Sequence, residues 1–140
     1  MKLEREQNLR YFLMKNIELV YVVEDDPISS FVIKLALQQH QSFEESIELQ
    51  NGQIAMDSLV QADNVRPELI LLDINMPVMD GWEFLEKFSE LPFSEKIPVV
   101  MLTSSINPDD IEKAKSHPLV KGFLSKPLNQ EKLDEVLTFI

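Results

Sequence analysis

The stretch Leu69-Ile70-Leu71-Leu72-Asp73-Ile74-Asn75-Met76-Pro77-Val78-Met79-Asp80-Gly81-Trp82 decides how this chain of 140 residues is interpreted. It begins with an apolar run that is too short for a helix and is typical of a strand buried on both faces. The run ends at Asp73, Pro77 prevents a helix or strand from continuing, and Asp80-Gly81 marks a tight turn. Because α/β proteins place their chemistry at the carboxyl ends of parallel strands, Asp73 is the first candidate functional residue.

The composition is that of a globular protein and argues against several classes of function. The chain has 24 acidic and 13 basic residues, a net charge of −11, which is unfavourable for binding nucleic acid or anionic membranes. It has no cysteine, which excludes disulfides and zinc–thiolate sites and suits a reducing compartment. No apolar run approaches the ~18 residues of a membrane-spanning helix, and charges near the N-terminus argue against a signal peptide. We therefore expect a cytoplasmic protein with no membrane insertion and no nucleic-acid partner.

Strand and helix patterns alternate along most of the chain. Strands are predicted over Ile17–Val23, Phe43–Leu49, Leu69–Leu72, Ile97–Leu102 and Gly122–Leu124, and the second is polar enough for a sheet edge. Helices are predicted after Pro27 (N-cap Asp26), Asn51-Gly52, Gly81, Pro108 (N-cap Asn107) and Asn129. Five such repeats predict an α/β fold with a doubly wound, five-stranded parallel sheet and right-handed crossovers.

The helices supply candidate core residues. Those predicted to supply their apolar faces are Phe31, Ile33, Leu35, Leu37, Ile54, Ala55, Leu59, Val60, Leu133, Val136, Leu137 and Ile140. Residues 1–16 are expected to be an N-terminal extension, either a short helix with Leu9, Phe12 and Leu13 on one face or a segment outside the core. Residues 17–140 are expected to form the domain.

Polar side chains follow four of the five predicted strands. Glu24 and Asp25 follow the first, Asp73 the third, Thr103 the fourth and Lys126 the fifth. Carboxyl ends of parallel strands share one edge of a sheet, so these side chains can converge. Three crowded carboxylates require a cation, and Mg²⁺ fits because it binds through few carboxylates and leaves positions for water and phosphate oxygens. A lysine and a hydroxyl beside that ion suit a phosphoryl group undergoing transfer.

These motifs, in this order, resemble the receiver domain of two-component response regulators, which has a flavodoxin-like (βα)₅ topology. The resemblance covers roughly Glu18 to Ile140. It implies that Asp73 accepts a phosphoryl group from a sensor histidine kinase or phosphotransfer protein and forms an acyl phosphate. It also implies that Mg²⁺ is bound by Asp25, Asp73 and the backbone carbonyl of Asn75, with Glu24 acting through water. Lys126 then pairs with Asp73 or with the phosphoryl oxygens.

The resemblance further implies a conformational switch. The Thr103 hydroxyl moves toward the phosphoryl group, and Phe123, at the family's switch-aromatic position, turns inward. This alters the face formed by the fourth helix, the fifth strand and the fifth helix, where a downstream protein is expected to bind near Ile111, Lys115, Lys121 and Phe123. The Lys126-Pro127 bond is expected to be cis. The chain is then a phosphoacceptor that catalyses its own phosphorylation and slow dephosphorylation, without an external substrate. Because the sequence stops at the fifth helix, a stand-alone receiver is expected.

Purely structural roles for some of these residues and two alternative functions are also compatible with the sequence. Asp26 is interpreted as a helix cap rather than a ligand, although a one-residue shift would exchange it with Asp25. Phe123 is either a moving switch or plain core, and His40 and His117 are interpreted as surface residues. One rival function is a receiver-like interaction module that is never phosphorylated. Another is a Mg²⁺-dependent phosphohydrolase of the haloacid-dehalogenase type, which is disfavoured because Asn75 stands where that family has a second acid.

Overall fold

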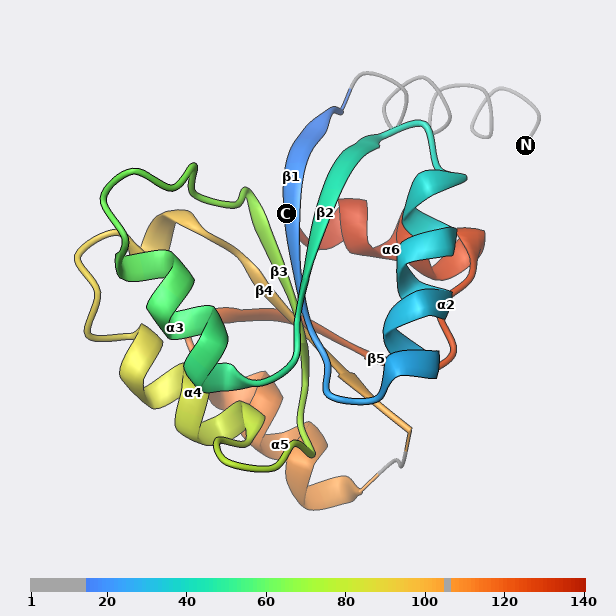
Figure 1. Ribbon diagram of the computed structural model, residues 1–140. Helices are drawn as coiled ribbons and strands as arrows, with labels where there is room; N and C mark the ends of the chain where they lie inside the picture. The colour runs from blue at the N-terminus through green and yellow to red at the C-terminus, as the bar shows by residue number, and fades with distance from the viewer. Residues whose placement is uncertain (1–14, 105–106) are drawn as a thin grey trace.

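Five parallel strands form one sheet in the computed structural model, which describes residues 15–104 and 107–140 (Figure 1). The strands are β1 (Ile17–Val23), β2 (Phe43–Leu49), β3 (Leu69–Asp73), β4 (Val99–Thr103) and β5 (Val120–Ser125), in the order β2-β1-β3-β4-β5. The predicted doubly wound sheet is confirmed, and β2 is the predicted edge strand. The chain changes winding direction between β1 and β3, and ligands bind at the carboxyl ends of strands at such a point.

Helices cover both faces of the sheet. They are α2 (Pro27–Gln38), α3 (Gly52–Val60), α4 (Gly81–Phe88), α5 (Pro108–Ser116) and α6 (Gln130–Phe139), with a 3₁₀ helix, η1, at Ser94–Lys96. Figure 1 shows α2 and α6 on one face and α3, α4 and α5 on the other. Each face has its own cluster of buried apolar side chains, so β3 is buried on both sides as its continuous apolar run predicts.

The helix starts follow from polar caps. Asp26, Asn107 and Asn129 each accept a hydrogen bond from a backbone amide in the first turn of the helix that follows, which confirms the three predicted N-caps. Asp80 forms a capping box with Glu83, which fixes where α4 begins after the loop that follows Asp73.

Four predicted core residues are instead exposed. Phe31 and Leu35 on α2 are 62% and 42% exposed, and Ile54 and Val60 on α3 are 40% and 58% exposed. A helix packed on a sheet buries one stripe, and the buried stripe of α2 consists of Ile33, Ala36 and Leu37. Ile140 is half-buried, whereas Leu133, Val136 and Leu137 are buried as predicted.

The bounds of β4 and β5 differ from those predicted for the fourth and fifth strands. β4 begins at Val99 rather than Ile97, since Pro98 has no amide hydrogen to donate to a neighbouring strand. β5 is longer than predicted and reaches back to Val120 across a register shift opposite Val99 and Val100. The Lys126-Pro127 bond is cis, as expected.

Two further expectations concern the ends of the sheet and the chain. His40 is not a surface residue: its ring is 9% exposed, its Nε2 lies 2.8 Å from Asp134 Oδ1, and it meets the Phe43 ring edge-on.

The predicted stripe of Leu9, Phe12 and Leu13 lies outside the described residues. In the part of the chain that the structure describes, no helix is long and apolar enough to cross a membrane.

Candidate functional site

Three carboxylates gather where β1 and β3 end. Glu24 and Asp25 follow β1 directly and Asp73 is the last residue of β3. Each offers an oxygen within 4.8 Å of those of the other two. Glu24 and Asp73 are 3% and 5% exposed, so two of the three negative charges are largely withdrawn from water. Such an arrangement is unfavourable unless positive charge compensates it.

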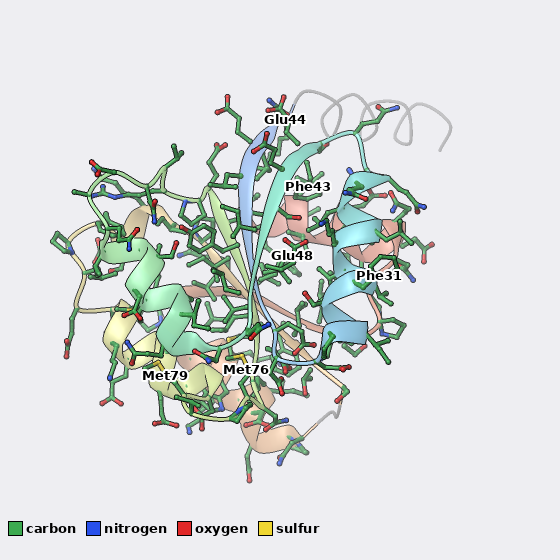
Figure 2. The ribbon with its side chains drawn as sticks, in the orientation of Figure 1. Phe31, Phe43, Glu44, Glu48, Met76 and Met79 are labelled. Atoms are coloured by element: carbon green, nitrogen blue, oxygen red, sulfur yellow. The ribbon has the colours of Figure 1, made fainter. Side chains whose placement is uncertain are left out.

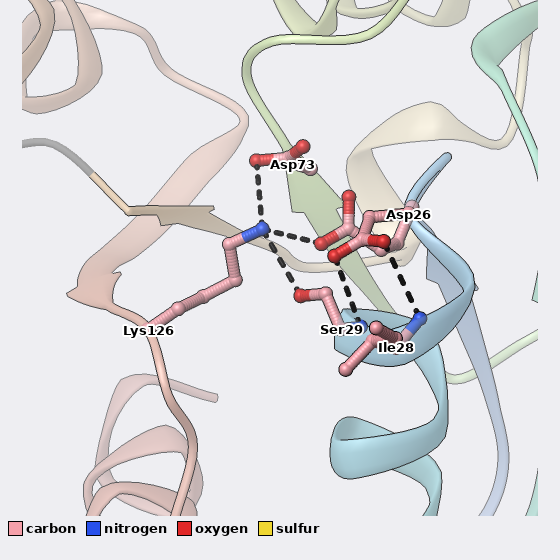
Figure 3. A network of polar contacts seen from close by, with 6 residues as sticks. Asp26, Ile28, Ser29, Asp73 and Lys126 are labelled. Atoms are coloured by element: carbon pink, nitrogen blue, oxygen red, sulfur yellow. Dashed lines mark hydrogen bonds and ion pairs between the residues drawn. The ribbon is translucent and has the colours of Figure 1, made fainter.

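Lys126 supplies part of that positive charge from the end of β5. Its Nζ forms an ion pair with Glu24, lies 3.5 Å from Asp73 Oδ1, and donates a hydrogen bond to Ser29 Oγ at 3.1 Å (Figure 3). Its backbone amide donates to the Thr103 carbonyl oxygen at 2.7 Å, which ties the start of the β5–α6 loop to the end of β4. The lysine is therefore positioned at both its backbone and its ammonium group.

The close packing of Glu24, Asp73 and Lys126 shifts the pKa of each of these groups. Burial, together with the hydrogen bond and negative charge of Glu24, raises the pKa of Asp73 to about 7, although Lys126 opposes the shift. Burial alone would raise the pKa of Glu24, but hydrogen bonds with Asp73 and Lys126 outweigh it and the pKa falls. Burial disfavours the charged form of Lys126, yet its two carboxylate partners raise the pKa of the ammonium group. Asp73 is thus the carboxyl group that takes up a proton near neutral pH.

The loop after Asp73 folds back tightly onto the end of β3. The Gly81 amide donates to the Ile74 carbonyl oxygen at 2.8 Å, and a Cβ atom at Gly81 would lie 2.7 Å from the Asp73 carbonyl oxygen. Glycine is therefore required at this position. Met76 and Met79 are buried and belong to the core cluster beneath the loop (Figure 2). Val78 is exposed at the loop tip with a φ of 69°, a conformation that is strained for a β-branched residue.

A cavity of about 460 Å³ opens above the carboxylates. Asn75 lines this cavity, as expected from the sequence. Asp26 lines it as well, although its side chain also caps α2. Thr103 is fully buried at the end of β4, opposite Ser125, and is not among the lining residues. The neighbouring Ser104 lines the cavity instead.

Several lining residues were missed by sequence reasoning. Ser29, Ile28 and Val32 from α2 and Leu128 after the cis proline all border the cavity. Ser29 carried a usable signal, because it lies in the first turn of a helix that starts immediately after the acidic pair. The role of Leu128 depends on the path of the chain after Lys126 and has no local signature.

The donor set fits a hard divalent cation. Within the described ranges, Glu24 Oε2 is buried and has no hydrogen-bond partner. Among the residues that the structure describes, Glu24, Asp25 and Asp73 face one ammonium group, that of Lys126, which leaves an excess of negative charge. Carboxylate and carbonyl oxygens are the ligands that Mg²⁺ prefers. The residues present therefore suit Mg²⁺.

The predicted switch residue Phe123 lies on a second hollow. Ile111, Lys115, Lys121 and Phe123, with Phe139, line a cavity of about 520 Å³ between α5, β5 and α6. Phe123 is half-buried and paired with Met101 of β4, two residues before the Thr103–Ser125 pair. The structure thus brings together the four residues predicted for partner binding. Trp82 links α4 to α5, because its Nε1 donates to Asp110 at 3.3 Å.

Comparison with known proteins places this geometry in a family. The sequence profile described as "Response regulator receiver domain" matches residues 20–138. The chain belongs to the response regulator receiver family. The receiver domain is 38% identical over 98 residues to response regulator Rcp1 of Synechocystis, covering 67% of both chains. The receiver domain is therefore a component of two-component signalling.

Solved structures agree with this assignment. A two-component response regulator from Cytophaga hutchinsonii superimposes with a TM-score of 0.82 at 30% identity, over 89% of this chain and 96% of that one. The phosphorylated cyanobacterial phytochrome response regulator RcpA gives a TM-score of 0.72 at 33% identity, over 87% of this chain and 89% of that one. The Mn²⁺-bound form of Rcp1 gives 0.70 at 34% identity, over 85% and 88%. The receiver domain is thus similar to phytochrome response regulators.

Proposed function

We propose that this receiver domain accepts a phosphoryl group on Asp73 from a phosphohistidine of a sensor histidine kinase or phosphotransfer protein. The observation that carries the proposal is the placement of the Asp73 carboxylate 3.5 Å from Lys126 Nζ, at the floor of an open cavity. The proposal is supported by the relatives whose structures are described as phosphorylated and as Mn²⁺-bound. Mg²⁺ would be held by Glu24, Asp25, Asp73 and the backbone carbonyl of Asn75.

The side chains divide the chemistry between them. An Asp73 oxygen attacks phosphorus, the phosphorus–nitrogen bond breaks, and the imidazole leaves with the bonding electrons, which gives an acyl phosphate on Asp73. Lys126 compensates the charge that accumulates on the transferred group. Because the pKa of Asp73 is raised to about 7, this carboxyl is partly protonated at neutral pH and is then a poor nucleophile. Mg²⁺, when bound, supplies positive charge that favours the ionised carboxylate.

The output follows from the connection between the site and β5. A phosphoryl group adds about −1.5 to −2 charge, which attracts the Thr103 hydroxyl and the Lys126 ammonium group. Movement at Thr103 affects the adjoining β4–β5 pair, in which Phe123 lies two residues before Ser125. In this proposal Phe123 turns inward and alters the α5-β5-α6 face, where a downstream protein binds. In the same proposal, residues 17–140 form the receiver domain and residues 1–16 are an extension. The protein acts in the cytoplasm as a phosphoacceptor.

The proposal is tested by intact-mass measurement after incubation with acetyl phosphate. The wild-type protein is expected to gain one phosphoryl group with Mg²⁺ and none with EDTA. Asp73→Asn is expected to gain none, whereas Asp63→Asn, which removes an exposed carboxylate of equal charge, is labelled like the wild type. Absence of labelling together with absence of beryllofluoride binding would overturn the proposal in favour of a non-phosphorylated interaction module.

A further inference from the structure

The strand β2 forms one edge of the sheet, with β1 as its one neighbour among residues 15–104 and 107–140 (Figure 1). The Glu24 amide donates to the Leu49 carbonyl oxygen at 2.9 Å. In a parallel ladder every second residue turns its N–H and C=O toward the same neighbour, so Ile47 faces β1 as Leu49 does. The backbone groups of Ser46 and Glu48 are therefore turned outward, where a strand of another chain can bond to them.

A hollow lies on each side of the sheet beside this edge. The larger, of about 610 Å³, is lined by residues of β1 and β2 and by Ser58 of α3. The smaller, of about 200 Å³, lies between β2 and α2. Because successive residues of a strand point to opposite faces of a sheet, a strand added to β2 places alternate side chains over the two hollows.

The lining of the larger hollow suits a long basic side chain. Ile47 and Val65, which are 42% and 75% exposed, supply apolar surface. Glu18, Glu44 and Glu45 supply carboxylates around it. Arginine and lysine combine an apolar stem with a cationic end, so either side chain can contact both kinds of surface.

The charge along this edge favours a basic occupant. None of the ion pairs within the described segments involves Glu18, Glu44 or Glu45. The Glu18 amide donates to a further carboxylate, that of Glu68, at 2.7 Å. Glu48 differs, because its carboxylate lies 3.4 Å from Lys34 of α2. The acidic groups beside the larger hollow are thus the ones available to a cation from outside.

The same charge argues against a second copy of the chain as the occupant. Charged side chains on an edge strand oppose its pairing with itself. Two copies joined through β2 would bring together Glu44, Glu45 and Glu48 of each, which are labelled in part in Figure 2, in chains whose net charge is −11. A basic strand is attracted by these carboxylates instead.

We propose that residues 44–48, which we call the β2 edge, bind an extended segment of another protein in which arginine or lysine alternates with apolar residues. The segment's backbone bonds to Ser46 and Glu48, and its basic side chains enter the larger hollow. Its apolar side chains lie over the smaller hollow, which Leu37 and Phe43 line. The contact uses none of the carboxylates of the candidate site, so it forms whether or not the domain is phosphorylated.

The proposal is tested by NMR measurement of hydrogen exchange at single backbone amides. The probe is a blocked ten-residue peptide of alternating arginine and valine, mixed with the full-length unphosphorylated protein. At about ten times the dissociation constant of the peptide, exchange at Ser46 and Glu48 is expected to slow about tenfold. The Ile47 amide already faces β1 and is expected to change little. This alternation along β2 distinguishes an added strand from a diffuse electrostatic contact.

Two variants separate the roles of charge and backbone. Glu44→Gln combined with Glu45→Gln is expected to weaken peptide binding about tenfold, since two ion pairs are lost. The matched control, Glu86→Gln with Glu90→Gln, removes the same charge at exposed positions elsewhere and is expected to leave the affinity unchanged. Ser46→Pro keeps every carboxylate but removes an outward amide, which an edge strand tolerates, and is also expected to weaken binding about tenfold. Circular dichroism checks that each variant is folded.

A peptide with every amide N-methylated keeps its charge but cannot donate hydrogen bonds, and it is expected to give no protection. Equal protection by that peptide, or unchanged affinity in the variant lacking Glu44 and Glu45, would overturn the proposal. Amides of Ser46 and Glu48 that are already protected in the free protein would overturn it as well, in favour of a second copy where protection rises with protein concentration. Because the protein is unphosphorylated throughout, failure here is distinguishable from a failure of Asp73 to accept a phosphoryl group.

Discussion

Replacing Asp73 with asparagine is expected to make the metal-free protein more stable. Folding raises the pKa of the Asp73 carboxyl from 3.8 to about 7, since the group is buried beside Glu24. The folded state therefore holds this proton more tightly than the unfolded state. The ionised carboxylate costs no stability below pH 4, a growing amount between pH 4 and 7, and its full amount above pH 7.

The magnitude follows from the size of the shift. A shift of about three pKa units corresponds to about 4 kcal/mol at pH 8. The asparagine amide must itself be desolvated, so we expect Asp73→Asn to gain about 2 to 4 kcal/mol. At roughly 3 °C per kcal/mol for a domain of this size, the melting temperature rises by about 6 to 12 °C.

The assay is thermal unfolding at pH 8 with EDTA and again with Mg²⁺. With Mg²⁺ at ten times its dissociation constant, the wild type is expected to gain about 1.4 kcal/mol and the variant much less. The difference in stability between the two proteins therefore becomes smaller when the ion is present. Asp63→Asn, which makes the same change of net charge at an exposed position, is expected to show neither effect. A variant that is less stable than the wild type in EDTA would refute the argument that Asp73 is held against carboxylate repulsion.

Three further predictions concern the loop and the ion. Because Asp73 binds a proton below about pH 7, the affinity for Mg²⁺ should fall about tenfold per pH unit below that value. Calorimetric titrations that show equal affinity at about pH 5.5 and pH 7.5 would contradict this. Gly81→Ala should displace the loop from the Asp73 carbonyl oxygen and destabilise the protein by about 2 kcal/mol, measured by urea unfolding, and an unchanged midpoint would refute the close approach. Val78→Gly should relieve the positive φ and stabilise the protein by about 1 kcal/mol in the same assay, with a loss of stability as the opposing result.

The fold was largely predictable because its strongest signals are local. The buried run before Asp73, the caps at Asp26 and Asn107, and the prolines at helix starts each act through their immediate neighbours. Such features are readable in one sequence. The alternation of strand and helix predicted a doubly wound parallel sheet. The strand order β2-β1-β3-β4-β5 agrees with the flavodoxin-like topology that the family resemblance implied.

The error on α2 also has a physical reason. Phe31, Ile33, Leu35 and Leu37 recur every two residues, which is the period of a strand and cannot place all four on one face of a helix. The helical period assigns Ile33 and Leu37 to the core and leaves Phe31 and Leu35 on the exposed side of the helix. At the helical period, the sequence Pro27–Gln38 therefore does indicate which face of α2 is buried.

The properties of the site depend on long-range contacts and were less accessible. The shared position of Glu24, Asp25 and Asp73 followed from the strand ends, but the contact of Ser29 with Lys126 joins residues 97 positions apart. The raised pKa of Asp73 depends on how deeply Glu24 and Asp73 are buried together. No pattern within β1 or β3 encodes that depth.

The central claim, that Asp73 is the phosphoacceptor, is tested most directly by locating the modified residue. After incubation with acetyl phosphate and Mg²⁺, borohydride reduces an acyl phosphate to an alcohol, which marks the side chain for peptide mass mapping. The account predicts one Mg²⁺-dependent modification, at Asp73, that is absent when EDTA replaces the ion. Modification at Asp25 or Asp26 with Asp73 unmodified would contradict it.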